Sequence, residues 1–174
     1  MNINISDKYI INQITMLNFD DRNIDEIPPL TKYIKLVRLM MNNNKLQNLP
    51  DLPKSLRHLS FKNNYVSELP SNLPPKLLSL NFENNKIQVL PKLPYSLKIL
   101  ICNNNQIKNI DTIFNNNNLL RLDCLNNNFN ISYNQLPSSL LVLNQMNLVK
   151  QPKIFSLKDI IFELEYDSDD DEVL

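Results

Sequence analysis

The sequence predicts a solenoid, in which short turns of chain stack so that their parallel strands form one sheet. Three observations support this prediction. A pattern rich in leucine returns every 20 to 22 residues, asparagine recurs at one fixed point of that pattern, and prolines gather in the segments that connect successive turns. A chain of 174 residues with 30 leucines and 18 isoleucines also has enough apolar side chains to build a core.

The repeating pattern is L-x-x-L-x-Φ-x-x-N-x-Φ, where Φ is an apolar residue, and each occurrence is called a row here. The seven rows begin at Ile14, Leu36, Leu56, Leu77, Leu97, Leu119 and Leu140. The fourth position is leucine in every row: Leu17, Leu39, Leu59, Leu80, Leu100, Leu122 and Leu143. The ninth position is asparagine in rows two to six, whereas row seven carries Leu148 there and is degenerate.

Each row predicts one short strand. The fourth and sixth positions are two residues apart, so their side chains share one strand face and are expected to point into the solenoid. The third, fifth and seventh positions are expected to point to the solvent. Seven strands at a spacing of about 4.8 Å give a sheet about 30 Å long.

The rest of the row also has a structural interpretation. The asparagine of the ninth position follows the strand, where its amide can satisfy backbone groups of neighbouring turns. The prolines that come next favour extended chain over helix. Row five differs, because it returns through Ile110, Asp111, Thr112 and Ile113 without proline.

The rows resemble the leucine-rich-repeat family, whose repeats of 20–29 residues open with L-x-x-L-x-L-x-x-N/C-x-L. The resemblance covers roughly residues 14–148. Returns such as Leu49-Pro50-Asp51-Leu52-Pro53 are similar to the short L-P-x-L-P repeats of bacterial effectors and of giant-virus or amoebal repeat proteins. The resemblance implies a leucine-rich-repeat solenoid with a parallel β-sheet on its concave side. It implies mostly extended chain and turns, with little helix, on the convex side.

The ends of a solenoid expose its core and need caps. We expect an N-terminal cap at 1–13, repeats at 14–148, a C-terminal cap at 149–164 and a disordered acidic tail at 165–174. Residues 1–162 hold all 18 basic and 11 of the 18 acidic side chains, and therefore carry a charge of +7. In the tail, Ser168 stands among acids and is a candidate phosphorylation site; a plain solubilising tail is the alternative.

The composition excludes several kinds of chemistry. The chain has no glycine, which the P-loop, the dinucleotide-binding turn and the nucleophile elbow all need. The segment from Met1 to Ile10 has no long apolar run, so no secretion signal is expected, and no stretch has the roughly 20 apolar residues of a membrane helix. We expect a cytoplasmic protein without a cofactor. The resemblance to giant-virus repeat proteins also implies, as one possible location, the interior of a virus-infected host cell.

The sole histidine and the two cysteines are expected to play no chemical role. His58 stands in a solvent-facing column beside Arg38 and Ser79, without a carboxylate to orient it as a base. Cys102 and Cys124 occupy the sixth position of adjacent rows, where parallel strands aim both side chains in the same direction. That geometry suits buried free thiols better than a disulfide, and it leaves the histidine and the cysteines on opposite faces of the sheet.

The solvent-facing strand positions remain as the candidate binding surface for a protein partner. Its apolar members, Ile99, Ile101, Leu125, Val142 and Met146, gather in rows five to seven. The candidate residues are Arg38, Met40, His58, Ile99, Ile101, Arg121, Asp123, Leu125, Val142 and Met146. An exposed apolar cluster of this kind indicates a protein contact, unless the C-terminal cap folds back over it.

The sequence therefore predicts a non-enzymatic, monomeric scaffold for protein–protein interaction, with a partner on the concave face. Two alternatives stay open: a structural or decoy repeat protein without a fixed partner, and a substrate adaptor of a ubiquitin-type system. Nucleic-acid binding has little support, because the chain offers no array of aromatic side chains for stacking bases. The identity of the partner is not predicted.

Overall fold

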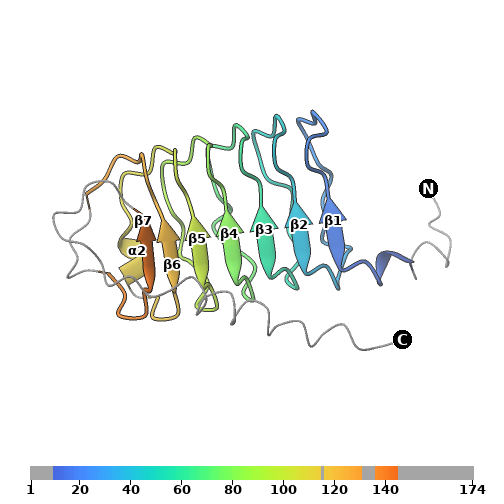
Figure 1. Cartoon of the computed structure of the whole chain (residues 1–174). Coiled ribbons are helices and arrows are strands. Elements are labelled where there is room, and N and C mark those ends of the chain that lie inside the picture. The colour runs from blue at the N-terminus through green and yellow to red at the C-terminus, as the bar shows by residue number, and fades with distance from the viewer. Residues whose placement is uncertain (1–9, 115, 131–135, 145–174) are drawn as a thin grey trace.

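The computed structural model describes residues 10–114, 116–130 and 136–144. One parallel sheet with the strand order β1-β2-β3-β4-β5-β6-β7 runs through this part of the chain (Figure 1). Its three-residue strands are β1 (Met16–Asn18), β2 (Arg38–Met40), β3 (His58–Ser60), β4 (Ser79–Asn81), β5 (Ile99–Ile101), β6 (Arg121–Asp123) and β7 (Val142–Asn144). Each predicted row supplies one strand, so the predicted count is confirmed.

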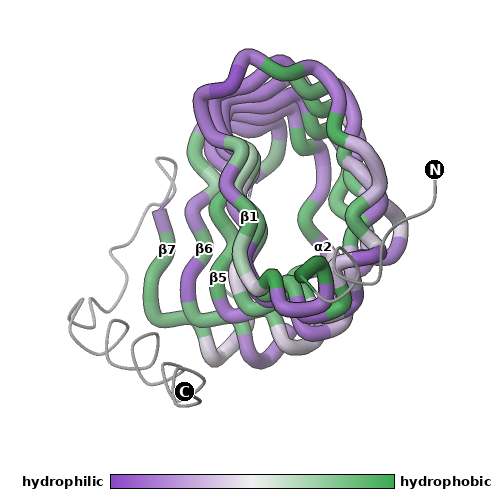
Figure 2. Tube along the Cα trace, turned by 90° about the vertical axis from the view of Figure 1, so that its right-hand side faces the viewer, coloured by the Kyte–Doolittle hydropathy of each residue, from purple (hydrophilic) through white to green (hydrophobic). Residues whose placement is uncertain are grey.

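The register of the sheet follows the columns of the sequence. Leu17 pairs with Leu39 and Leu39 with Leu59, and the fourth-position leucines continue in this way to Leu143. Along the stack, the strands lie on one side of the solenoid and the return segments on the other (Figure 2). The predicted solenoid, with a sheet on one side and mostly turns and extended chain on the other, is confirmed.

The core lies between the sheet and the return segments. In rows two to six, the side chains of the first, fourth, sixth and eleventh positions point inward, and nearly all are fully buried. Phe61 and Phe82, at the sixth position of rows three and four, stack with their ring centroids 5.9 Å apart. Rows one and seven are less enclosed, since Leu17 and Leu143 are only partly buried.

The ninth-position asparagines bind backbone groups inside the solenoid, as predicted. The amide nitrogen of Asn85 donates to the carbonyl oxygens of Phe61, Phe82 and Glu83 at 3.1, 3.0 and 3.3 Å. Its Oδ1 accepts from the backbone N–H of Val66 at 3.0 Å. The side chain of Asn85 thus satisfies backbone groups of its own row and of the row before it. The same pattern recurs at Asn44, Asn64, Asn105 and Asn127.

The eighth position has a separate role, which explains how the chain turns without glycine. Its residues in rows two to six are Asn43, Asn63, Asn84, Asn104 and Asn126, all with φ between 53° and 56°. Asparagine tolerates this left-handed region better than other residues with a side chain. The exposed amides also form a ladder, in which each donates to the asparagine of the preceding row at 2.5–2.6 Å.

The return segments that the structure describes are extended except in row five. There the chain forms the single-turn helix α2 (Asp111–Phe114), and it packs Ile113 into the core. Asn109 caps the turn, because its Oδ1 accepts from the backbone N–H of Asp111 at 2.6 Å. The prediction of little helix is thus confirmed, with this one helical return where proline is missing.

Of the predicted domains, the structure describes the end of the N-terminal cap and most of the repeats. Residues 10 and 11 begin the described chain in a helical turn, and the N–H of Gln13 donates to the carbonyl oxygen of Ile10 at 3.0 Å. The rest of the N-terminal cap, the C-terminal cap at 149–164 and the acidic tail at 165–174 lie outside the described residues. Met146 and Ser168 lie outside them as well.

Candidate functional site

The outer face of the sheet, formed by the third, fifth and seventh row positions, is the predicted binding surface. The register brings its candidate residues into two columns. The third-position column runs Met16, Arg38, His58, Ser79, Ile99, Arg121 and Val142; the fifth-position column runs Asn18, Met40, Ser60, Asn81, Ile101, Asp123 and Asn144. Arg38 is exposed, while Met40, His58, Ile101, Arg121, Leu125 and Val142 are half-buried.

Two of the predicted contact residues are less accessible than expected. Ile99 is 8% exposed and Asp123 is 4% exposed, so the prediction that they face the solvent is wrong. Ile99 lies on a central strand beside Arg121, and the aliphatic stem of an arginine can cover a neighbouring apolar side chain. Asp123 is buried because its carboxylate accepts hydrogen bonds from polar side chains on its own strand and on the next one. Neither residue presents much surface to a partner.

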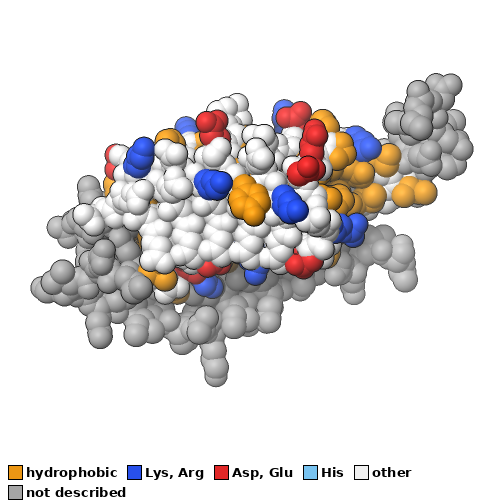
Figure 3. All heavy atoms as spheres, turned by 90° about the horizontal axis from the view of Figure 1, so that it is seen from above, with side chains coloured by type: hydrophobic (Ala, Val, Ile, Leu, Met, Phe, Trp, Pro, Cys, Tyr) orange, Lys and Arg blue, Asp and Glu red, His pale blue; other side chains and the backbone are white. Residues whose placement is uncertain are grey.

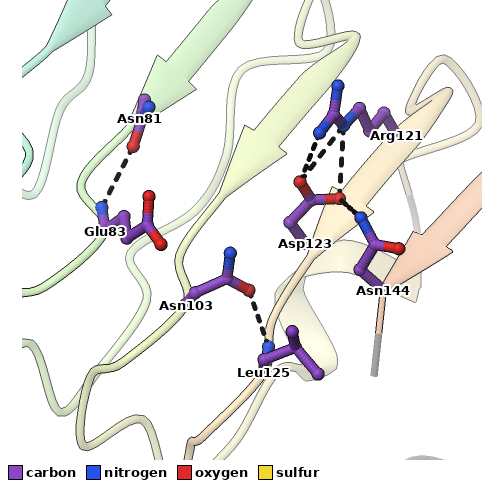
Figure 4. Close-up of polar contacts among 7 residues, drawn as sticks. All are labelled: Asn81, Glu83, Asn103, Arg121, Asp123, Leu125 and Asn144. Carbon is purple, nitrogen blue, oxygen red and sulfur yellow. Dashed lines mark hydrogen bonds and ion pairs between the residues drawn. The ribbon is translucent and has the colours of Figure 1, made fainter. Parts of the chain in front are cut away.

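Asp123 is the centre of a polar network on strands β6 and β7 (Figure 4). The Nη2 atom of Arg121 lies 2.6 Å from Asp123 Oδ2, and the Nε atom lies 3.2 Å from both carboxylate oxygens. Asn144 donates its amide to Oδ1 at 2.7 Å. The hydrogen bonds to Asp123 raise the pKa of the Arg121 guanidinium. A buried carboxylate needs such partners, because an uncompensated charge there would be strongly destabilising.

The cation of this network, Arg121, belongs to a face that also carries apolar side chains. The side chain of Arg121 is 31% exposed, in contrast to that of Asp123 at 5%. Three half-buried apolar side chains belong to the same face: Ile101 of β5, Val142 of β7 and Leu125, two residues after β6. An arginine that is held by a buried carboxylate and flanked by apolar side chains can anchor a partner at little entropic cost.

The seventh position proves to be structural in rows one, two and five, where it holds Asp20, Asn42 and Asn103, and this role was not predicted. The Oδ1 atom of Asn103 accepts from the backbone N–H of Leu125 in the next row at 2.8 Å (Figure 4). Asn42 does the same for Lys62 at 2.9 Å and is 7% exposed, so its expected exposure is wrong. Such a contact joins residues about 20 positions apart. An asparagine or aspartate at the seventh position, two residues before the ninth, is the sequence feature that could have predicted this contact.

The two thiols are free and buried, as predicted. Burial raises the pKa of Cys102 well above its ordinary value, and the neighbouring Cys124 and Asp123 add to the effect. Burial, followed by the charge of Asp123, raises the pKa of Cys124 to about 12. Both thiols therefore stay protonated and unreactive in the folded chain.

These raised pKa values predict a loss of stability at alkaline pH. In the unfolded chain a thiol loses its proton from about pH 8.5, while the folded chain keeps it to about pH 12 at Cys124. The unfolded state then binds fewer protons, so the free energy of unfolding falls as the pH rises through this window. We expect a loss of about 1.4 kcal/mol per thiol by about pH 9.5. Urea denaturation at about pH 7.5 and 9.5 measures it, and the double variant Cys102→Ala/Cys124→Ala should lack this part of the slope.

Other site chemistry finds no support in the described residues. Within them, no group of three or more histidine, cysteine, aspartate or glutamate side chains is placed to hold a metal ion. The described helices include none that is long and apolar enough to cross a membrane. His58 lies half-buried in β3, opposite Arg38 and Ser79 of the adjacent strands, as its column predicted.

The return side carries a groove that the sequence did not predict. It has a volume of about 580 Å³ and lies along the L-P-x-L-P segments of rows two and three. Leu49, Leu52 and Leu69 contribute to its lining, with Asp51 and Lys54 among its charged groups. Row three has one residue more than row two, so its return cannot follow the preceding one closely. That change of spacing was the signal in the sequence.

Comparison with known proteins agrees with this geometry. No family model matches the chain. Osteomodulin from Bos taurus is 39% identical over 69 residues, which make up 37% of this chain and 16% of osteomodulin. YopM from Yersinia enterocolitica is similar in structure, with a TM-score of 0.56 and 32% identity over 68% of this chain and 27% of YopM.

An internalin from Listeria monocytogenes shares the fold, with a TM-score of 0.61 and 22% identity over 83% of this chain and 51% of the internalin. The chain thus spans about a quarter of YopM and about a sixth of osteomodulin. The row signature, the seven-strand register and the similarity to YopM lead to the same conclusion: the chain folds as a leucine-rich-repeat solenoid, and its rows are similar to the short, bacterial-effector type.

Proposed function

We propose that the chain is a protein-interaction scaffold that holds a partner protein on the outer sheet face at rows five to seven. The observation that supports it best is the half-exposed Arg121, held by the buried Asp123 on a face that also presents the half-buried Ile101, Leu125 and Val142. Leucine-rich-repeat proteins are generally interaction modules rather than enzymes. The free, buried thiols fit a reducing compartment, so we place this role in the cytoplasm.

The remaining candidate residues have a secondary role in this proposal. Arg38, Met40 and His58 lie on β2 and β3, where the fifth position continues with Ser60 and the surface is polar. A contact that spreads toward these rows gains orientation and specificity from the polar side chains, while the apolar rows supply most of the affinity. Met146, outside the described residues, would extend the apolar rows beyond β7.

A pair of glutamate substitutions tests this proposal. The double variant Ile101→Glu/Leu125→Glu places two charges among the apolar side chains of the face, and we expect capture of the partner to fall at least about tenfold, equivalent to about 1.4 kcal/mol. Cross-linking and pull-down from cells that naturally express the chain measure the effect. The matched control is Val89→Glu/Tyr95→Glu, at positions that are 71% and 68% exposed and lie outside the outer sheet face.

The control should capture the partner as well as the native chain does, and circular dichroism should show that both variants are folded. Equal capture by the face variant and the native chain would show that the partner binds elsewhere. If the native chain captures no protein above the background of an unrelated solenoid, the structural or decoy alternative is favoured instead.

A further inference from the structure

The charges of the solenoid are distributed unevenly between the two edges of the sheet. The amino edge is defined here as the two residues before each row together with the first three row positions, at the lower side of the sheet in Figure 1. Over all seven rows this edge contains no aspartate or glutamate. Its cations are Lys35, Arg38, Lys54, Arg57, Lys76, Lys98 and Arg121.

These side chains lie on one border of the molecule because the strands are parallel and in register. Lys35, Lys54 and Lys76 are exposed, while Arg57 and Lys98 are half-buried. Arg121 pairs with Asp123, but within the described residues Lys54 and Lys76 form no ion pair. Six cations outside that pair therefore follow one another across rows two to five, at a strand spacing of about 4.8 Å.

The opposite edge is different in character. Seen from above, it consists mainly of backbone and uncharged polar side chains, with charges of both signs and some hydrophobic side chains scattered over it (Figure 3). The asparagine ladder from Asn43 to Asn126 lies on this side, where the strands end. The asymmetry is therefore a property of one edge and not of the solenoid as a whole.

We propose that the amino edge is the docking surface for the acidic segment of the same chain, residues 163–172. That segment holds seven carboxylates and no basic residue, and it complements the +7 of residues 1–162. Asp167 is 23 residues beyond Asn144, the last residue of β7. The upper limit of the span, for a fully extended chain of that length, is roughly 75 Å, and the predicted cap at 149–164 would shorten it; six strand spacings amount to about 29 Å, so rows two to five are within this limit.

The proposed contact is electrostatic, so salt and phosphorylation change its strength. Exposed pairs of this kind contribute little individually, so the segment should exchange rapidly and dissociate as salt screens the charges. A phosphate on Ser168 would add a charge of about −1.5 to −2 and make the docked state more resistant to salt. The docked segment shields the cationic edge from other polyanions and leaves the apolar rows of the proposed partner site for a protein.

A nitroxide in the acidic segment tests the proposal on the full chain. The variant Ser168→Cys can be labelled selectively, because the native thiols Cys102 and Cys124 are 0% and 2% exposed. In about 10 mM salt, where the Debye length is about 30 Å, we expect the label to broaden amide resonances of the amino edge in rows two to five. In about 1 M salt, where that length is about 3 Å, the broadening should disappear.

Charge reversal identifies the surface. In the labelled chain, Lys35→Glu, Lys54→Glu and Lys76→Glu together should abolish the broadening at low salt. The matched control reverses Lys45, Lys86 and Lys108, which are also exposed but lie after the strands; it should leave the broadening intact. The salt response of the native edge provides the same information if the triple variant does not fold.

Broadening that is absent at low salt, or that survives reversal of the three amino-edge lysines, would overturn the proposal. Binding of a short oligonucleotide to the amino edge with equal affinity in the full chain and in a chain that ends at residue 162 would also overturn it, because the edge would then serve an external polyanion. A weaker affinity in the full chain supports the proposal.

Discussion

Replacement of Phe82 by alanine is expected to lower the free energy of unfolding by about 3–5 kcal/mol, one of the largest effects available in this chain. Phe82 is fully buried at the sixth position of row four, where its ring stacks on Phe61. Its removal loses the transfer free energy of the ring and leaves a cavity between two rows. The rows cannot close that cavity, because their backbones are held in register on both sides.

Chemical denaturation by urea, followed by far-ultraviolet circular dichroism, measures this loss. Val89→Ala is the matched control: Val89 belongs to the same row but is 71% exposed, so its truncation should change stability by less than about 0.5 kcal/mol. A solenoid depends on contacts between neighbouring rows, so the Phe82 variant should also broaden the transition by uncoupling the two halves. A Phe82 variant within 1 kcal/mol of the native chain, by the same measurement, would contradict the assigned core.

The buried columns could be predicted from the sequence because their cause is local and periodic. Leu39, Leu59 and Leu80 recur with the length of one turn, and a side chain two positions away on a strand must share their face. The ninth-position asparagine was predictable for the same reason. Periodicity therefore determines which way a side chain points and which rows are neighbours.

The accessibility of the outer face was less predictable, because it depends on which side chains meet across rows. Asp123 is buried by Arg121, two residues away, and by Asn144, on the next strand. The repeat period alone predicts the same environment for Asp123 as for Asn81, which occupies the same column and is half-buried. The α2 turn was missed for a different reason: the lack of proline in row five was noted, but the capping asparagine at Asn109 was not taken as a helix start.

The ninth-position column has an energetic consequence as large as that of the core. In Asn85→Ala, the backbone carbonyl oxygens of Phe61, Phe82 and Glu83 and the N–H of Val66 lose a partner together. The three carbonyl oxygens keep a donor in Asn64, Asn105 and the N–H of Asn63, so the N–H of Val66 is the group left without its partner. Four hydrogen bonds are lost at about 0.5–1.5 kcal/mol each. We therefore expect a total loss of about 3 kcal/mol, which is a fall in the melting temperature of roughly 6–12 °C for a domain of this size.

The control for this substitution is Asn72→Ala, which removes an exposed asparagine from the return segment of row three and should change the melting temperature by little. Asn85→Asp is more informative than alanine. Aspartate keeps the oxygen that accepts from Val66 but replaces the donor by a second acceptor, which then faces three carbonyl oxygens. If the amide nitrogen is the stabilising group, Asn85→Asp should be at least as unstable as Asn85→Ala at neutral pH and should recover part of the loss in acid, where the carboxyl group can donate. An aspartate variant as stable as the native chain would show that the acceptor alone sustains the turn.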